Sequence, residues 1–196
     1  MCCKEPAPNE LVAGGAWHGE RRVAEWEKDG EAGKRDISPL AKPGWRSTIG
    51  TMKHSAAALA LFSQGVCCSQ AVFAAYAAEY GLDRDTALKV SAGFGGGMGR
   101  MALTCGAVTG AYLVLGLKYG AASGDKEAKE KTYRLVREFA EKFKVRNGSA
   151  VCRDLLGCDI STPEGFETMK QKGLHQAVCA RLVSDACELL DEMLKD

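Results

Sequence analysis

The chain has 196 residues and a formal net charge of +1, with 46% hydrophobic and 26% charged residues. This is ordinary globular composition, and a charge so close to zero gives no electrostatic case for binding nucleic acid or an anionic membrane. Nine cysteines are the unusual feature. The odd count, and a start without a basic-then-apolar signal segment, argue against a secreted disulfide scaffold and favour reduced thiols in the cytoplasm.

Residues 1–51 differ in composition from the rest of the chain. They hold all three tryptophans and four of the five prolines, and they show little sustained helical or strand periodicity. We therefore predict a loosely ordered extension over 1–51 and a helical domain over 52–196. Within the extension, the adjacent Cys2 and Cys3 could bind metal or be acylated, but an incidental pair is the simpler interpretation.

From residue 53 onward the apolar residues recur at helical spacing, and no segment alternates as a strand does. The expected fold is a compact all-α, multi-helix bundle. Its predicted helices cover 54–62, 68–80, a segment capped by Asp83 that ends near 90, 104–119, 125–144, a segment capped by Ser149 that ends near 156, a segment that begins at 162–164, and 174–194. The longest uncharged run near the chain centre, 101–117, has 17 residues. Because a membrane span needs about 20, we expect a buried core helix there and no membrane span.

A glycine-rich run over 93–99 follows the third of these helices. It has neither the preceding strand nor the following acidic residue of a dinucleotide-binding loop, so we expect it to let the backbone pack closely against a helix or a cofactor. A stripe of small residues in the next helix predicts close helix packing too: Gly106, Ala107, Gly110 and Ala111. On the helix over 125–144, charges at four-residue spacing predict three surface ion pairs: Glu127–Lys131, Glu130–Arg134 and Glu138–Lys142.

Three cysteines lie in or near the first turn of a predicted helix: Cys68, Cys105 and Cys152. Helix N-termini present unpaired N–H groups and a partial positive charge. That environment lowers the pKa of a thiol and favours the thiolate, the form that binds metal or attacks a disulfide. Packing alone explains any single buried cysteine, whereas three such placements in one chain favour a site.

Four segments together resemble a known family: FSQGVCCSQAV at 62–72, CGAVTG at 105–110, CRDLLG at 152–157, and Cys179 followed by LVSDA at 182–186. The chain resembles the redox-active family named for its C…GCAxxG…C…C cysteines, over roughly residues 53–194. The pattern carries over to Cys68, Cys105, Cys152 and Cys179. A similar domain in split-Soret cytochromes is associated with an iron–sulfur centre, so the resemblance implies a [2Fe–2S] or [4Fe–4S] cluster held by these four cysteines. Covalent haem is not implied, because the chain lacks Cys-x-x-Cys-His.

The residues leave other chemistries open. Four thiolates also suit structural zinc in an interaction module, and a metal-free thiol-disulfide protein would use Cys67–Cys68 or Cys152–Cys158. Three further cysteines lie outside the family pattern: Cys67, Cys158 and Cys187. Of these, Cys67 and Cys158 are alternate ligands, and His175 lies four residues before Cys179, where it could face the same site. Hydrolase motifs are absent from the sequence. We therefore expect an electron carrier or redox-active protein more than a stand-alone enzyme, with an unidentified redox protein as its partner and a homodimer as a possibility.

Overall fold

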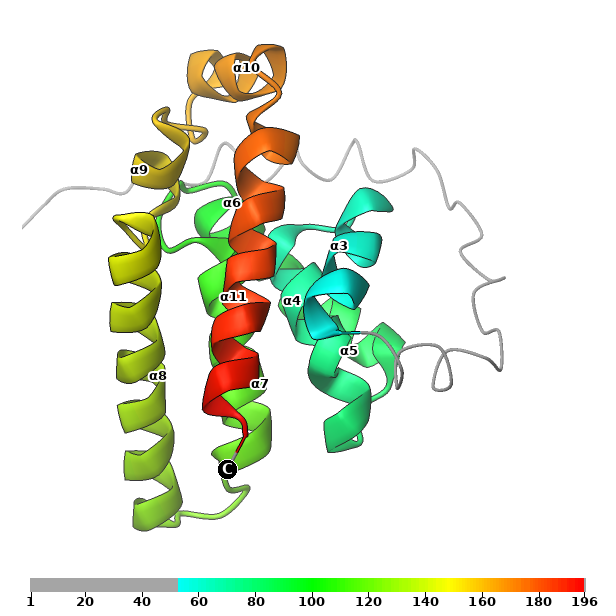
Figure 1. Cartoon of the computed structure of the whole chain (residues 1–196), viewed down its shortest axis with the longest axis vertical. Helices are drawn as coiled ribbons and strands as arrows, with labels where there is room; N and C mark the ends of the chain where they lie inside the picture. The colour runs from blue at the N-terminus through cyan, green and yellow to red at the C-terminus, as the bar shows by residue number, and fades with distance from the viewer. Residues whose placement is uncertain (1–52, 196) are drawn as a thin grey trace, which may run out of the picture. The chain divides into compact units, whose positions relative to one another are not determined.

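The computed structural model describes residues 53–195, and the predicted extension over 1–51, with Cys2 and Cys3, lies outside the described residues. Between 53 and 195 the chain is helical and forms no strand, only one isolated bridge pair, so the all-α prediction is confirmed (Figure 1). In this same part of the chain, no helix is both long enough and apolar enough to cross a membrane.

The α-helical elements run, in chain order, α3 (His54–Ser63), α4 (Cys68–Ala77), α5 (Arg84–Ser91), α6 (Gly95–Met98), α7 (Gly106–Tyr119), α8 (Lys126–Asn147), α9 (Cys152–Leu156), α10 (Pro163–Gln171) and α11 (Ala180–Met193). Short 3₁₀ turns cover Ala78–Tyr80 and Ala92–Phe94, and a π-helical turn covers His175–Cys179. Helix ends agree with the sequence where a side chain caps them. The Asp83 carboxylate accepts a hydrogen bond from the Thr86 N–H, and the Thr162 hydroxyl accepts one from the Gly165 N–H.

Two predicted caps are wrong. The N-cap of α7 is Cys105 instead of Thr104, and the N-cap of α9 is Val151 instead of Ser149. The reason is tertiary: Thr104 and Val151 pair with each other in an isolated antiparallel bridge, which fixes the backbone just before each helix. Ser149 still accepts a hydrogen bond from the Val151 N–H, but it does so outside the helix.

The core forms where α7 packs against α4 on one side and α8 on the other, while α11 packs against α3, α7 and α8 (Figure 1). The small-residue stripe serves this packing, as predicted. A Cβ on Gly110 would lie 2.8 Å from the Ser69 carbonyl oxygen and 3.0 Å from the Val72 Cβ, so only glycine lets α7 approach α4 this closely. Phe139 and Phe143 of α8 complete the buried interior.

The surface of α8 differs from the prediction in two of its three ion pairs. Glu138 and Lys142 pair at 2.9 Å, but the pairs Glu127–Lys131 and Glu130–Arg134 do not form within residues 53–195. The Lys131 ammonium lies instead 4.5 Å from the centre of the Tyr119 ring. A cation–π contact competes well with an exposed ion pair, because the latter contributes little in water.

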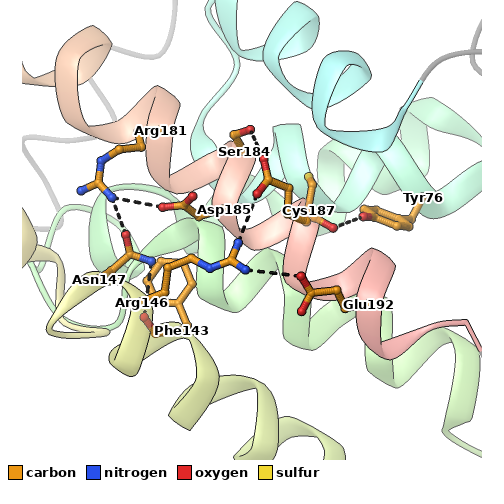
Figure 2. Close-up of polar contacts among 10 residues, drawn as sticks. Tyr76, Phe143, Arg146, Asn147, Arg181, Ser184, Asp185, Cys187 and Glu192 are labelled. Atoms are coloured by element: carbon orange, nitrogen blue, oxygen red, sulfur yellow. Dashed lines mark hydrogen bonds and ion pairs between the residues drawn. The ribbon is translucent and has the colours of Figure 1, made fainter.

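The C-terminal end of α8 is tied to α11 by a layer of charged side chains (Figure 2). Arg146 reaches Glu188 at 3.2 Å and Glu192 at 3.4 Å, while Arg181 donates to Asn147 at 2.6 Å and to Asp185 at 3.1 Å. This end of α8 leads directly into α9, and α11 directly follows the π-helical turn, so the layer joins the segments that carry Cys152 and Cys179.

A second polar cluster joins α3, α4 and α11, and we call it the polar clasp: His54, Tyr76, Glu79 and Asp191. The His54 Nδ1 lies 2.6 Å from an Asp191 carboxylate oxygen, and its Nε2 lies 2.5 Å from a Glu79 carboxylate oxygen. The Tyr76 hydroxyl donates to Asp191 at 2.7 Å, and its ring stacks on His54 with 3.9 Å between ring centres. Each polar group of the clasp therefore has a partner.

Candidate functional site

One cavity brings together all four cysteines of the predicted site: Cys68, Cys105, Cys152 and Cys179. Its volume is about 70 Å³, several times the roughly 10–15 Å³ that one water molecule requires. The remaining lining consists of Cys67, Gly96 and His175 with the apolar side chains of Phe62, Leu155, Leu156, Ile160, Met169 and Leu182. The four segments lie far apart in sequence, so their meeting is a property of the folded bundle.

Each of the four cysteines lies at the end of a helical element. Cys68 is the first residue of α4, Cys105 is the N-cap of α7, and Cys152 is the first residue of α9. Cys179 is the last residue of the π-helical turn before α11. The prediction that three of them lie at helix starts is confirmed. The π turn was not predicted, and turns of this kind often occur at functional sites because they re-aim one side chain within a helix.

The isolated bridge holds two of the cysteines beside each other. The Cys105 N–H donates to the Ala150 carbonyl at 2.8 Å, and the Cys152 N–H donates to the Leu103 carbonyl at 2.6 Å. These bonds lie on either side of the Thr104–Val151 pair. The backbone therefore fixes the separation of Cys105 and Cys152 before their side chains make any contact.

Glycines lie against Cys67, Cys68 and Cys152, and two of them, Gly95 and Gly97, belong to the glycine-rich run that was predicted to allow close packing. A Cβ on Gly106 would collide with the Cys68 sulfur, a Cβ on Gly95 would lie 2.6 Å from the Cys67 sulfur, and one on Gly97 would lie 2.7 Å from the Cys152 Cβ. Real Cβ atoms essentially never lie within 3.0 Å of another heavy atom of this kind. The cysteine side chains therefore occupy space that any larger residue at these glycines would fill.

The predicted lowering of thiol pKa values is wrong. Burial raises the pKa of Cys152 and of Cys179 to about 12, and neighbouring thiols add to the rise. Burial also raises the pKa of Cys68, and it holds that of Cys105 well above the usual range, although N–H groups of Gly96 and Ala107 act in the opposite direction. Loss of water around the charged form outweighs the helix N-terminus here, since Cys105 and Cys152 are only 4% and 6% exposed.

Of the residues outside the predicted set, His175 and Cys67 line the cavity. The His175 ring stacks on Phe62 with 4.4 Å between ring centres, and burial lowers its pKa. Cys158 is half-buried, and its proximity helps to raise the pKa values of Cys152 and Cys179. Cys187 is fully buried in the middle of α11, where the Tyr76 hydroxyl that bonds to Asp191 also lies 2.8 Å from the Cys187 carbonyl oxygen.

The donor set fits a soft metal or cluster. Thiols, one imidazole and the Met169 thioether are side chains along the cavity wall that can ligate a soft metal, and the other lining side chains are apolar. Thiolates bind iron–sulfur clusters and zinc, and a bound cation would offset the burial that keeps these thiols protonated. With the side chains as placed, no three His, Cys, Asp or Glu residues among 53–195 are arranged around a single metal ion.

Comparison with known proteins identifies one family. The family model described as "Putative redox-active protein (C_GCAxxG_C_C)" matches residues 66–193, well over half of the chain. Neither a search of curated proteins nor a search of solved structures finds a match. In this chain the second motif reads Cys105-Gly106-Ala107, with cysteine and glycine in the reverse of the order in the family's description. The match over 66–193 shows that the chain belongs to the C_GCAxxG_C_C family of redox-active proteins.

Proposed function

We propose that this protein binds an iron–sulfur cluster through Cys68, Cys105, Cys152 and Cys179 and transfers electrons. The observation that carries the proposal is that these four cysteines, from four distant segments, line one cavity of about 70 Å³. Such a space is larger than a single ion needs, which favours a polynuclear centre over zinc. When bound, the cluster would supply a centre that gains and loses one electron.

The surrounding residues would keep water away from the centre and stabilise its charge. Apolar side chains such as Leu156, Ile160 and Met169 separate the sulfurs from solvent. The backbone N–H groups of Gly96 and Ala107 favour the charged forms of the thiols, since they act to lower the pKa values of Cys68 and Cys105 against the effect of burial. Hydrogen bonds to ligand sulfurs stabilise the more negative state of a cluster and so raise its reduction potential.

The proposal is tested by anaerobic reconstitution of the full chain with ferrous iron and sulfide. We expect a brown protein with stoichiometric iron and sulfide and a spin-resonance signal in one oxidation state. The variant with serine at Cys68, Cys105, Cys152 and Cys179 should hold neither. Cys187→Ala is the matched control, because it removes a buried thiol outside the cavity. A colourless, iron-free wild-type protein after reconstitution would overturn the proposal.

Two other outcomes would select the other chemistries. Stoichiometric zinc with no redox response would favour a structural zinc module. A loss of two free thiols on mild oxidation, reversed by reductant and without metal, would favour a thiol-disulfide protein. The half-buried Cys158 beside Cys152 supports this second candidate, because it adds a thiol near the cavity that the cluster proposal does not use.

A further inference from the structure

The glycine-rich run includes the short element α6 (Gly95–Met98), whose backbone is not that of a right-handed helix: it forms a left-handed turn at the wall of the cavity. Every residue from Gly96 to Arg100 has a positive φ, with φ of 61° at Gly96, 69° at Gly97 and 66° at Met98. Its backbone is closed by bonds from the Leu103 N–H to the Gly97 carbonyl at 3.0 Å and from the Ala102 N–H to the Gly96 carbonyl at 3.3 Å. Consecutive left-handed residues are rare in proteins of L-amino acids, so the turn is an unusual device to find beside a candidate site.

Part of this turn is strained. Met98, Arg100 and Ala102 have φ values of 66°, 67° and 56°, although each carries a Cβ that disfavours this region. Such residues persist only where their surroundings hold them in place, and they concentrate at functional sites. Here the holding contacts include the Arg100 guanidinium over the Phe166 ring at 4.5 Å and the complete burial of Ala102.

The turn contacts the three segments that carry Cys68, Cys152 and Cys105. At the start of α4, Gly95 packs on Cys67, and Gly96 lines the cavity together with Cys68. At the start of α9, Gly97 packs on the Cys152 Cβ.

The end of the turn is bonded to α9 and continues into α7. The Leu103 carbonyl accepts from the Cys152 N–H, the Ala102 carbonyl accepts from the Arg153 N–H, and the chain then reaches Cys105 two residues later. One turn therefore touches or adjoins every ligand candidate except Cys179.

We propose that the left-handed turn is the positioning element of the site, and that Gly97 sets the place of Cys152 relative to Cys68 and Cys105. Two separate features favour glycine at position 97. Its φ is left-handed, and a Cβ would lie 2.7 Å from both the Cys152 Cβ and the Leu103 backbone nitrogen. This inference deepens the proposed function and rests on it only for the measurements that use iron.

Three glycine-to-alanine variants separate the two features. Gly93→Ala adds a Cβ with open space around it, at an ordinary φ. Gly99→Ala adds a Cβ at a φ of 63°, with only the Gly93 carbonyl oxygen nearby, at 3.7 Å, so it adds backbone strain alone. Gly97→Ala adds both the backbone strain and the collision with Cys152. If the contact with Cys152 matters, Gly97→Ala alone should displace that thiol. If strain alone matters, Gly99→Ala should behave like Gly97→Ala.

The first measurement uses metal-free protein, so that it is independent of the cluster. Each cysteine is alkylated with iodoacetamide under native conditions, and its rate is read by mass spectrometry. We expect Gly97→Ala to raise the rate at Cys152 by about tenfold, which corresponds to about 1.4 kcal/mol. The rate at Cys187, which lies in the middle of α11 and outside the cavity lining, should not change. Gly93→Ala and Gly99→Ala should leave both rates within about twofold of wild type, about 0.4 kcal/mol.

The second measurement uses reconstituted protein. Gly97→Ala should lose most of its iron or show a shifted reduction potential, while Gly93→Ala retains the wild-type values. If wild-type protein takes up no iron, the proposed function fails, but the alkylation result still decides the role of the turn. Equal Cys152 rates in Gly97→Ala and Gly99→Ala would overturn the inference.

Gly95→Ala keeps the test decisive if Gly97→Ala does not fold. Gly95 has an ordinary φ of −69°, so its Cβ meets the Cys67 side chain at 2.6 Å without added backbone strain. We expect faster alkylation of Cys67 and Cys68 in a protein whose circular dichroism stays helical. Unchanged rates at both cysteines would show that the turn does not position them.

Discussion

The two ends of α4 and α11 carry opposite kinds of side chain. At one end Cys68 and Cys179 line an apolar cavity. About 12 Å along α4, at 1.5 Å per residue, Tyr76 and Asp191 meet His54 in the polar clasp. The clasp leaves no polar group without a partner, whereas the cavity collects thiols whose charged forms are destabilised by burial. The clasp therefore joins α3, α4 and α11 through paired polar groups, whereas the cavity gathers four thiols within an apolar wall.

Replacing one cysteine sulfur should have the largest effect, a loss of iron binding. The structural change should be confined to the cavity. We expect Cys68→Ser to abolish iron binding in reconstituted protein, because the Cys68 thiol lies among those of Cys105, Cys152 and Cys179. The measurement is iron per chain, with circular dichroism as the check on folding. Cys187→Ala is the control and should bind iron normally. Full iron binding by Cys68→Ser would remove this residue from the ligand set.

Alkaline pH should lower the free energy of unfolding of the metal-free protein, because the cavity thiols resist ionisation only in the folded chain. The pKa values of Cys152 and Cys179 are about 12 in the folded chain, against about 8.5 for a solvated thiol. The unfolded chain therefore loses these protons first, and stability is complete below about pH 8.5 and falls as the pH rises toward 12. The slope is at most about 1.4 kcal/mol per pH unit for each thiol, measurable by urea unfolding.

The control for this pH dependence is the double variant with serine at Cys152 and Cys179. Its stability should fall less steeply between pH 9 and about 11 than that of wild type, since tyrosine and lysine titrations are common to both proteins. Parallel curves would mean that the two thiols ionise normally in the folded chain.

Gly106→Ala should disturb the cavity end by overpacking. The new Cβ would meet the Cys68 sulfur, the Phe94 carbonyl oxygen at 3.1 Å and the Ser69 nitrogen at 3.2 Å. We expect a loss of about 3 kcal/mol in the free energy of unfolding, at the upper end for overpacking because backbone atoms cannot move aside easily. Gly116→Ala on the same helix has open space and should instead stabilise by about 0.5–1 kcal/mol. Equal effects of the two variants would contradict the close approach of α7 to α4.

The smallest loss in the free energy of unfolding should come from a change in the polar clasp. His54→Ala removes the contacts to Asp191 and Glu79 and the stacking on Tyr76, and we expect a loss of about 2 kcal/mol. The alkylation rates of Cys105 and Cys152 should stay at the wild-type values. His54→Gln, which keeps one hydrogen bond, should recover part of the loss. A large rise in either rate would show that the two ends are coupled.

Several features could be predicted from local chemistry alone. Asp83, Asp125 and Thr162 lie at predicted helix starts that the structure shows. Capping depends on neighbours within one turn, so the sequence contains the whole interaction. The set of cysteines that line the cavity could also be predicted from the sequence, because the family pattern links these four positions.

Tertiary structure decided what depends on distant partners. Because of the Thr104–Val151 bridge, two helices begin at other residues than predicted. Lys131 contacts the Tyr119 ring instead of forming its predicted ion pair. The left-handed turn and the π turn needed contacts that lie many residues away. Above all, the position of the cysteines at helix starts predicted low thiol pKa values, whereas burial in the folded chain raises them. The sequence alone does not show this, because the desolvation of a charge depends on everything packed around it.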